Sequence, residues 1–138
     1  MAPDASTLAR IASGIAAFGS AMIIFRMQRE EQMRSEGERV WLPLADWLLV
    51  VPTLSCLLLI ILPISADFPL RLPAAVAAAS AVVVAGYLPS LLAHYRIVLG
   101  SERRGSRHNP EPIELVLVLI TVVAALVVGA WVYYRVAI

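Results

Sequence analysis

Residues 113–134, IELVLVLITVVAALVVGAWVYY, form an almost uninterrupted apolar stretch in which Glu114 is the only charged residue. These 22 residues make a helix about 33 Å long at 1.5 Å per residue, which is enough to cross the roughly 30 Å hydrocarbon core of a bilayer. Inside a bilayer there is no water to bind backbone N–H and C=O groups, so the segment must satisfy them itself. The stretch therefore predicts a transmembrane α-helix.

Three further runs of similar character precede it: Leu8–Phe25, Leu42–Ile64 and Leu72–Leu92. We therefore predict an all-α polytopic membrane protein with one domain, 1–138, built as a left-handed bundle of four transmembrane helices. The predicted spans cover about residues 8–25, 42–64, 72–99 and 113–134, and Arg-rich loops cover 26–41 and 100–112.

The composition supports this fold class. Hydrophobic residues make up 60% of the 138-residue chain and charged residues 15%, whereas soluble proteins average about 45–50% and 25%. A soluble protein of this composition would need to cover nearly every helix on all sides, which a chain of this length cannot do. All 11 basic residues are Arg, which suggests a GC-rich bacterial genome. Cys56, the lone cysteine, is expected to act as a small apolar side chain.

The Arg residues predict the orientation. Four lie between the first two spans (Arg26, Arg29, Arg34, Arg39) and four after the third (Arg96, Arg103, Arg104, Arg107). The opposite side holds Arg10, Arg71 and Arg135. Because positive residues are retained in the cytoplasm, both Arg-rich loops should be cytoplasmic and both termini outside, in a bacterial inner membrane.

The first helix should extend beyond the membrane. Arg and Glu alternate at i,i+4 spacing after Phe25, and such pairs support an exposed helix. We expect this helix to run from about Ser6 to about Glu36 and to project into the cytoplasm.

Small residues predict where the helices pack, because close approach drives association in lipid. The first span offers two stripes, Ala12–Ala16–Ser20 and Ser13–Ala17–Ala21, and the fourth offers Thr121–Ala125–Gly129. From these we predict Ser13, Ala17, Ala125 and Gly129 as packing positions.

The few polar residues within the spans recur at seven-residue spacing, which places each set on one helix face. They form a candidate polar seam: Asp46, Thr53, Ser80, Tyr87, His94, Glu114 and Thr121. Each also has a purely structural explanation, since hydroxyls can bond to their own helix and a carboxylate in a first turn favours the helix dipole. Both halves of the chain share one plan: a span, an Arg/Glu loop, a Pro, an acidic residue and a returning span.

No catalytic, cofactor-binding or metal-binding motif stands out, so we expect neither enzymatic activity nor a bound cofactor. The predicted role is a structural or accessory subunit that packs with itself or with a larger membrane complex. The alternative is a small oligomeric channel or a proton- or cation-coupled transporter that uses the polar seam; a membrane enzyme acting on lipid or quinone ranks third. The predicted partners are the lipid bilayer and other membrane proteins, with no nucleic acid.

Overall fold

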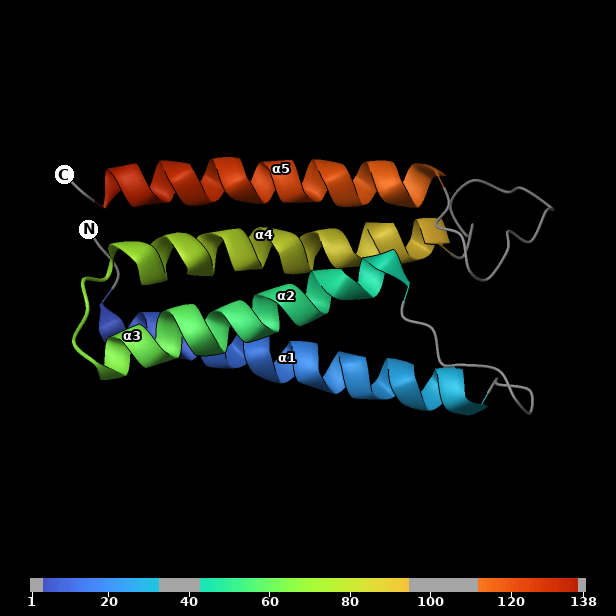
Figure 1. The fold of residues 1–138 in the computed structure, drawn as a ribbon, viewed down its shortest axis with the longest axis horizontal. Coiled ribbons are helices and arrows are strands. Elements are labelled where there is room, and N and C mark those ends of the chain that lie inside the picture. The colour runs from blue at the N-terminus through green and yellow to red at the C-terminus, as the bar shows by residue number, and fades with distance from the viewer. Residues whose placement is uncertain (1–3, 33–42, 95–111, 137–138) are drawn as a thin grey trace.

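The computed structural model describes residues 4–32, 43–94 and 112–136, and these form helices and turns only. Four of its helical segments are long and apolar enough to cross a membrane: Ala5–Arg29, Leu44–Ser65, Arg71–His94 and Pro112–Arg135. The all-helical, four-span fold predicted above is therefore confirmed. The four spans lie side by side in alternating directions (Figure 1), as short connections between consecutive helices require.

The first span is a single helix, α1 (Ala5–Gln32). Asp4 caps it: the Asp4 carboxylate accepts hydrogen bonds from the Thr7 backbone N–H at 2.7 Å and from the Ser6 hydroxyl at 2.8 Å. The Thr7 N–H holds the pKa of Asp4 below its ordinary value, because it stabilises the charged carboxylate. The expected extension of this helix to Glu36 lies partly outside the described residues.

The second span is a stack of four short helical segments: η1 (Leu44–Asp46), α2 (Trp47–Cys56), the π-helical segment η2 (Leu57–Ile61) and α3 (Leu62–Ser65). Pro63 explains the wide π turn, since it has no N–H to give to Leu59 and its ring crowds that carbonyl. Pro52 lies inside α2, whose helix continues through it.

A five-residue connection leads from α3 to the third span. The Phe68 N–H donates to the Pro63 carbonyl and the Asp67 N–H to the Ile64 carbonyl, which together form a Schellman motif. Asp67 takes the left-handed conformation that this motif requires, with φ of 55°. The turn reverses the chain so that α4 (Arg71–His94) runs back across the bundle. The predicted continuation of this helix to Leu99 lies outside the described residues.

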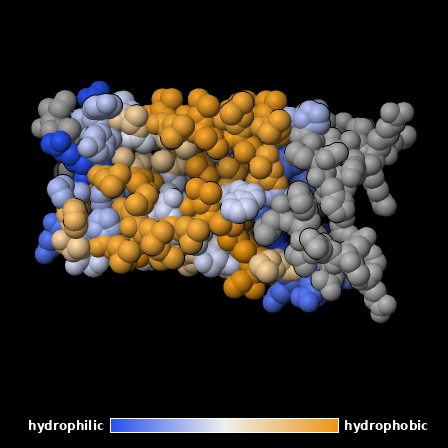
Figure 2. All heavy atoms as spheres, in the orientation of Figure 1, coloured by the Kyte–Doolittle hydropathy of each residue, from blue (hydrophilic) through white to orange (hydrophobic). Residues whose placement is uncertain are grey.

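The helix α5 (Pro112–Arg135) is the fourth span and lies at the edge of the bundle. It packs along α4 and touches η1 at its start, but hardly contacts α1 or α2. Only four of its residues are buried: Glu114, Thr121, Ala125 and Gly129. The remainder of α5 contributes much of the apolar band that crosses the middle of the molecule (Figure 2).

The helices approach one another most closely at glycines. A Cβ on Gly19 of α1 would collide with the Thr53 side chain of α2, and a Cβ on Gly86 of α4 would collide with the Thr121 side chain of α5. Gly129 similarly lies against Ala79 and the Ala75 carbonyl. The bundle is thus held by small-residue contacts, as expected where lipid removes the hydrophobic advantage of burying bulky side chains.

Candidate functional site

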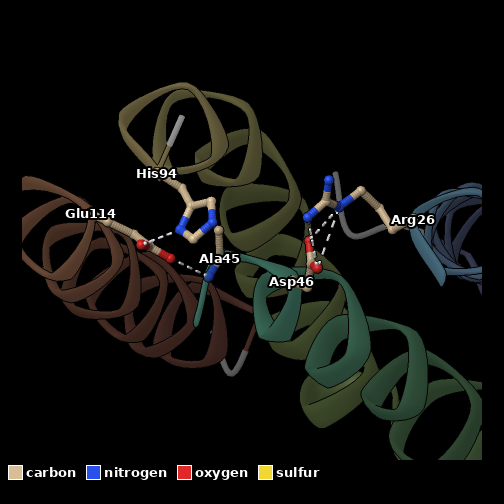
Figure 3. A network of polar contacts seen from close by, with 5 residues as sticks. All are labelled: Arg26, Ala45, Asp46, His94 and Glu114. Atoms are coloured by element: carbon tan, nitrogen blue, oxygen red, sulfur yellow. Dashed lines mark hydrogen bonds and ion pairs between the residues drawn. The ribbon is translucent and has the colours of Figure 1, made fainter. Parts of the chain in front are cut away.

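The buried charged side chains gather at one end of the bundle, where α1 and α4 end and η1 and α5 begin (Figure 3). Arg26, Asp46 and Glu114 are each at most 3% exposed. Within a bilayer, such groups are stable only if they pair with one another or line a hydrated cavity. Their partners therefore decide what the site can do.

Arg26 of α1 pairs with Asp46 of η1. The Arg26 Nε lies 3.3 Å from Asp46 Oδ1 and 3.4 Å from Oδ2, and Nη2 lies 3.5 Å from Oδ2. Because α1 is the first span and η1 begins the second, this pair joins the first and second spans.

Glu114 joins the other side. Its Oε1 accepts a hydrogen bond from the Ala45 backbone N–H at 2.9 Å, and its Oε2 lies 2.8 Å from Nδ1 of His94. That distance is typical of a hydrogen bond, whose donor depends on the tautomer of the imidazole. The first N–H groups of a helical segment have no partner inside it, so Glu114 caps η1 from a different span. His94 ends α4 and Glu114 lies in the first turn of α5, where the helix dipoles favour a cation and an anion respectively.

The consecutive residues Ala45 and Asp46 therefore connect both halves. Ala45 is tied through its backbone to α5 and hence to α4, while Asp46 is tied through its side chain to α1. We call these five residues (Arg26, Ala45, Asp46, His94, Glu114) the polar joint. All of its contacts lie at the end of the bundle toward the two Arg-rich segments.

The seven residues of the candidate polar seam all face inward. Six are at most 8% exposed and the His94 side chain is 17% exposed. They do not form one line, however. Thr53 lies between α1 and α2, Thr121 lies between α4 and α5, and Ser80 lies near the Cys56 thiol between α4 and α2. Only the end with Asp46, Tyr87, His94 and Glu114 forms a polar cluster.

The packing residues divide between the two outer helices. Ala125 and Gly129 are buried, and Gly129 lies against α4. Ser13 and Ala17 are exposed, so that expectation does not hold within one copy of the chain. Helix α1 packs instead through the neighbouring stripe Leu8, Ala12, Ala16 and Gly19, because Gly19 allows Thr53 to approach.

The sequence reasoning missed two features of the polar joint. It placed Arg26 in the charged loop beside Glu30, whereas Arg26 is buried and bonded to Asp46. It also treated the carboxylate of Glu114 as a cap for its own helix, whereas Glu114 caps the start of another span. The sequence contains a signal for these contacts. Two spans have a carboxylate near their start, and each of these spans follows one that ends in a basic residue.

An apolar groove of about 340 Å³ opens between α2 and α5, with α4 at its base. Two of its lining residues are polar, Ser55 and Ser80, and the others are apolar. The residues of the polar joint do not line it. The groove is therefore a hydrocarbon-facing surface and not a water path to the buried charges.

The fold defines a class: four apolar helices tied at one end by buried ion pairs are compatible with a small integral membrane protein. Among the described residues, no group of His, Cys, Asp and Glu could hold a metal ion. No family model, curated protein or solved structure compared with this chain matches it.

Proposed function

We propose that this chain is a structural or accessory protein of a membrane, which packs with further copies of itself or with a larger membrane protein. The observation that carries the proposal is the polar joint, in which buried charged groups bind one another across helices. Groups used in this way fix the relative positions of the spans.

The shape of the bundle supports a role in assembly. Because α5 is held mainly by α4, it leaves bulky apolar side chains exposed over most of its surface, among them Leu119, Leu126 and Trp131. Lipid can cover such a surface, and so can another transmembrane helix. We further propose a bacterial inner membrane, with the Arg-rich loops in the cytoplasm and the termini outside, on the basis of the Arg distribution.

Extraction in a mild detergent followed by native mass measurement tests this role. We expect an assembly of stoichiometric composition, either several copies of this chain or this chain with a second membrane protein. A protein that remains monomeric in nanodiscs, with no co-purifying chain, would contradict the proposal.

A second candidate is proton- or cation-coupled transport, because ionisable groups inside a membrane protein often mark an ion pathway. Here the favouring observation is the 2.8 Å contact between His94 Nδ1 and Glu114 Oε2 at the edge of the membrane span. If the protein transports protons or cations, Asp46→Asn and Glu114→Gln should abolish the flux of these ions into liposomes. Asp67→Asn, in the exposed turn, should leave that flux unchanged. Equal flux in all three variants and in protein-free liposomes would exclude transport.

A further inference from the structure

The two helical hairpins of this chain, α1 with the second span and α4 with α5, make the same internal contacts. In the first hairpin Gly19 lies on Thr53; in the second Gly86 lies on Thr121. In both, the glycine lacks the side chain that would block the threonine. The two contacts occupy the same place in their hairpins, near the middle of the spans.

The polar joint repeats in the same way. In the first hairpin the basic Arg26 bonds to the acidic Asp46, and in the second His94 bonds to Glu114. Asp46 precedes Thr53 by seven residues, and Glu114 precedes Thr121 by seven. Aligned on these glycines and threonines, positions in α4 correspond to those 67 earlier in α1, because Gly86 matches Gly19, and positions in α5 to those 68 earlier in the second span, because Thr121 matches Thr53. The two basic residues differ from this alignment by one position, since His94 lies 68 residues after Arg26.

The hairpins are joined through a central interface between α2 and α4. On α2, Leu49 and Cys56 are fully buried, and on α4, Tyr87 and Ser80 are at most 4% exposed. Leu49 lies in one apolar cluster with Tyr87, and Ser80 lies close to Cys56. These two contacts give the register of the central interface.

The equivalent positions at the two outer edges are not covered in this way. Tyr87 and Ser80 correspond to Ser20 and Ser13 on α1, and both are exposed. Leu49 and Cys56 correspond to Leu117 and Ala124 on α5, which are partly buried, and between them Ile120 is 58% exposed. Each hairpin edge that is buried at the centre of the molecule thus has a less covered counterpart at an outer edge, which is exposed on α1 and partly buried on α5.

We propose that a second copy of this chain docks the Ser13, Ala17 and Ser20 edge of its α1 onto the Leu117, Ile120 and Ala124 edge of α5, and so repeats the central interface between copies. The occupant follows from continuity with that interface, in which α4, the counterpart of α1, already fills the same position. Small residues on α1 would meet bulkier ones on α5, which permits close approach in lipid. Because the two edges differ, the contact is head-to-tail, and it forms a ring if the rotation closes.

This inference rests on the proposed function in the form in which the protein packs with further copies of itself. It adds specific residue pairs between copies, which can be tested separately from the existence of an assembly. By equivalence, Ser20 should lie opposite Leu117 of the neighbouring copy, and Ser13 opposite Ala124. Within one copy these positions lie at opposite edges of the bundle, so any cross-link between them joins two molecules.

Cysteine cross-linking in membranes is the test, in a background with Cys56→Ala. One tagged copy carries Ser13→Cys or Ser20→Cys and a second, differently tagged copy carries Ala124→Cys or Leu117→Cys. We expect covalent dimers from Ser13→Cys with Ala124→Cys and from Ser20→Cys with Leu117→Cys. The shifted pair, Ser13→Cys with Leu117→Cys, should give only background, since seven residues displace the contact by about 10 Å. Val122→Cys, on the groove side of α5, should give only background with either serine position.

A bulky substitution on the proposed edge of α1 tests whether this contact is needed for assembly, and the same substitution on another exposed face serves as its control. Ser13→Trp should dissociate the assembly in nanodiscs, while Ile11→Trp, on a different exposed face of α1, should leave it intact. An oligomer that forms without the two expected cross-links, or that survives Ser13→Trp, would overturn this docking mode and leave the proposed function standing. A protein that is monomeric in lipid and has no partner would overturn both.

Discussion

Ala45 and Asp46 show how two adjacent residues can connect four helices. The Ala45 N–H needs an acceptor because it lies at the start of a helical segment, and the Asp46 carboxylate needs a counter-charge because it is buried. Glu114 supplies the acceptor for the Ala45 N–H, and Arg26 supplies the counter-charge for Asp46. Removing either partner would leave a polar group unsatisfied inside the bundle, which costs about 1–3 kcal/mol and more for a charged group.

Asp67 allows a sharper prediction at this scale, because its backbone conformation suits glycine better than any residue with a Cβ. We expect Asp67→Gly to retain the fold and raise the free energy of unfolding by about 0.5 kcal/mol, and Asp67→Val to lower it by about 1–2 kcal/mol. Thermal denaturation of the purified protein in detergent would measure both. Equal stability of the Val variant and the native protein would show that the turn does not need the left-handed conformation.

At the scale of elements, contacts between helices depend on single glycines. Gly19 and Gly14 lie in the same helix, but only Gly19 faces another span, since a Cβ on Gly14 would meet nothing within 4 Å. The two positions therefore separate the packing role of glycine from its cost to the helix.

We expect Gly19→Ala to lower the free energy of unfolding by about 1–3 kcal/mol, because the added methyl group must displace the Thr53 side chain. Gly14→Ala should raise it by up to about 1 kcal/mol, since alanine favours the helix and the site has open space. Unfolding in mixed micelles measures both. The double variant Gly19→Ala with Thr53→Ala should recover part of the loss; failure to do so would place the strain elsewhere.

At the scale of the whole molecule, the alternating helices put Ser6 and the Ala66 turn at one end and Gln28 at the other. The proposed orientation places the first two positions outside the membrane and the third in the cytoplasm.

Single cysteines at these positions, in a Cys56→Ala background, would report this topology. In intact bacterial spheroplasts, a membrane-impermeant maleimide should label Ser6→Cys and Ala66→Cys, and should label Gln28→Cys only after permeabilisation. The reverse pattern would show that the protein is inserted the other way round. Labelling of Ser6→Cys and Ala66→Cys from opposite sides would contradict the four-span fold itself.

The four spans can be located from the amino-acid sequence alone, because the length of an apolar run and the need to satisfy backbone groups in lipid depend on local composition. The start and end of the described spans agree with the predicted ones to within a few residues for the second and fourth. Local sequence also indicated the inward-facing polar residues, since a seven-residue spacing places them on one side of a helix.

The partner of each of these residues, in contrast, depends on how the helices pack together. Arg26 could bond to a loop glutamate one helical turn away or to a carboxylate 20 residues away, and its sequence context does not distinguish them. The choice between the two small stripes of α1 likewise depended on where Thr53 lies. Pairings between spans depend on how the helices are rotated and shifted against one another, and this is set jointly by contacts from segments that are far apart in the chain.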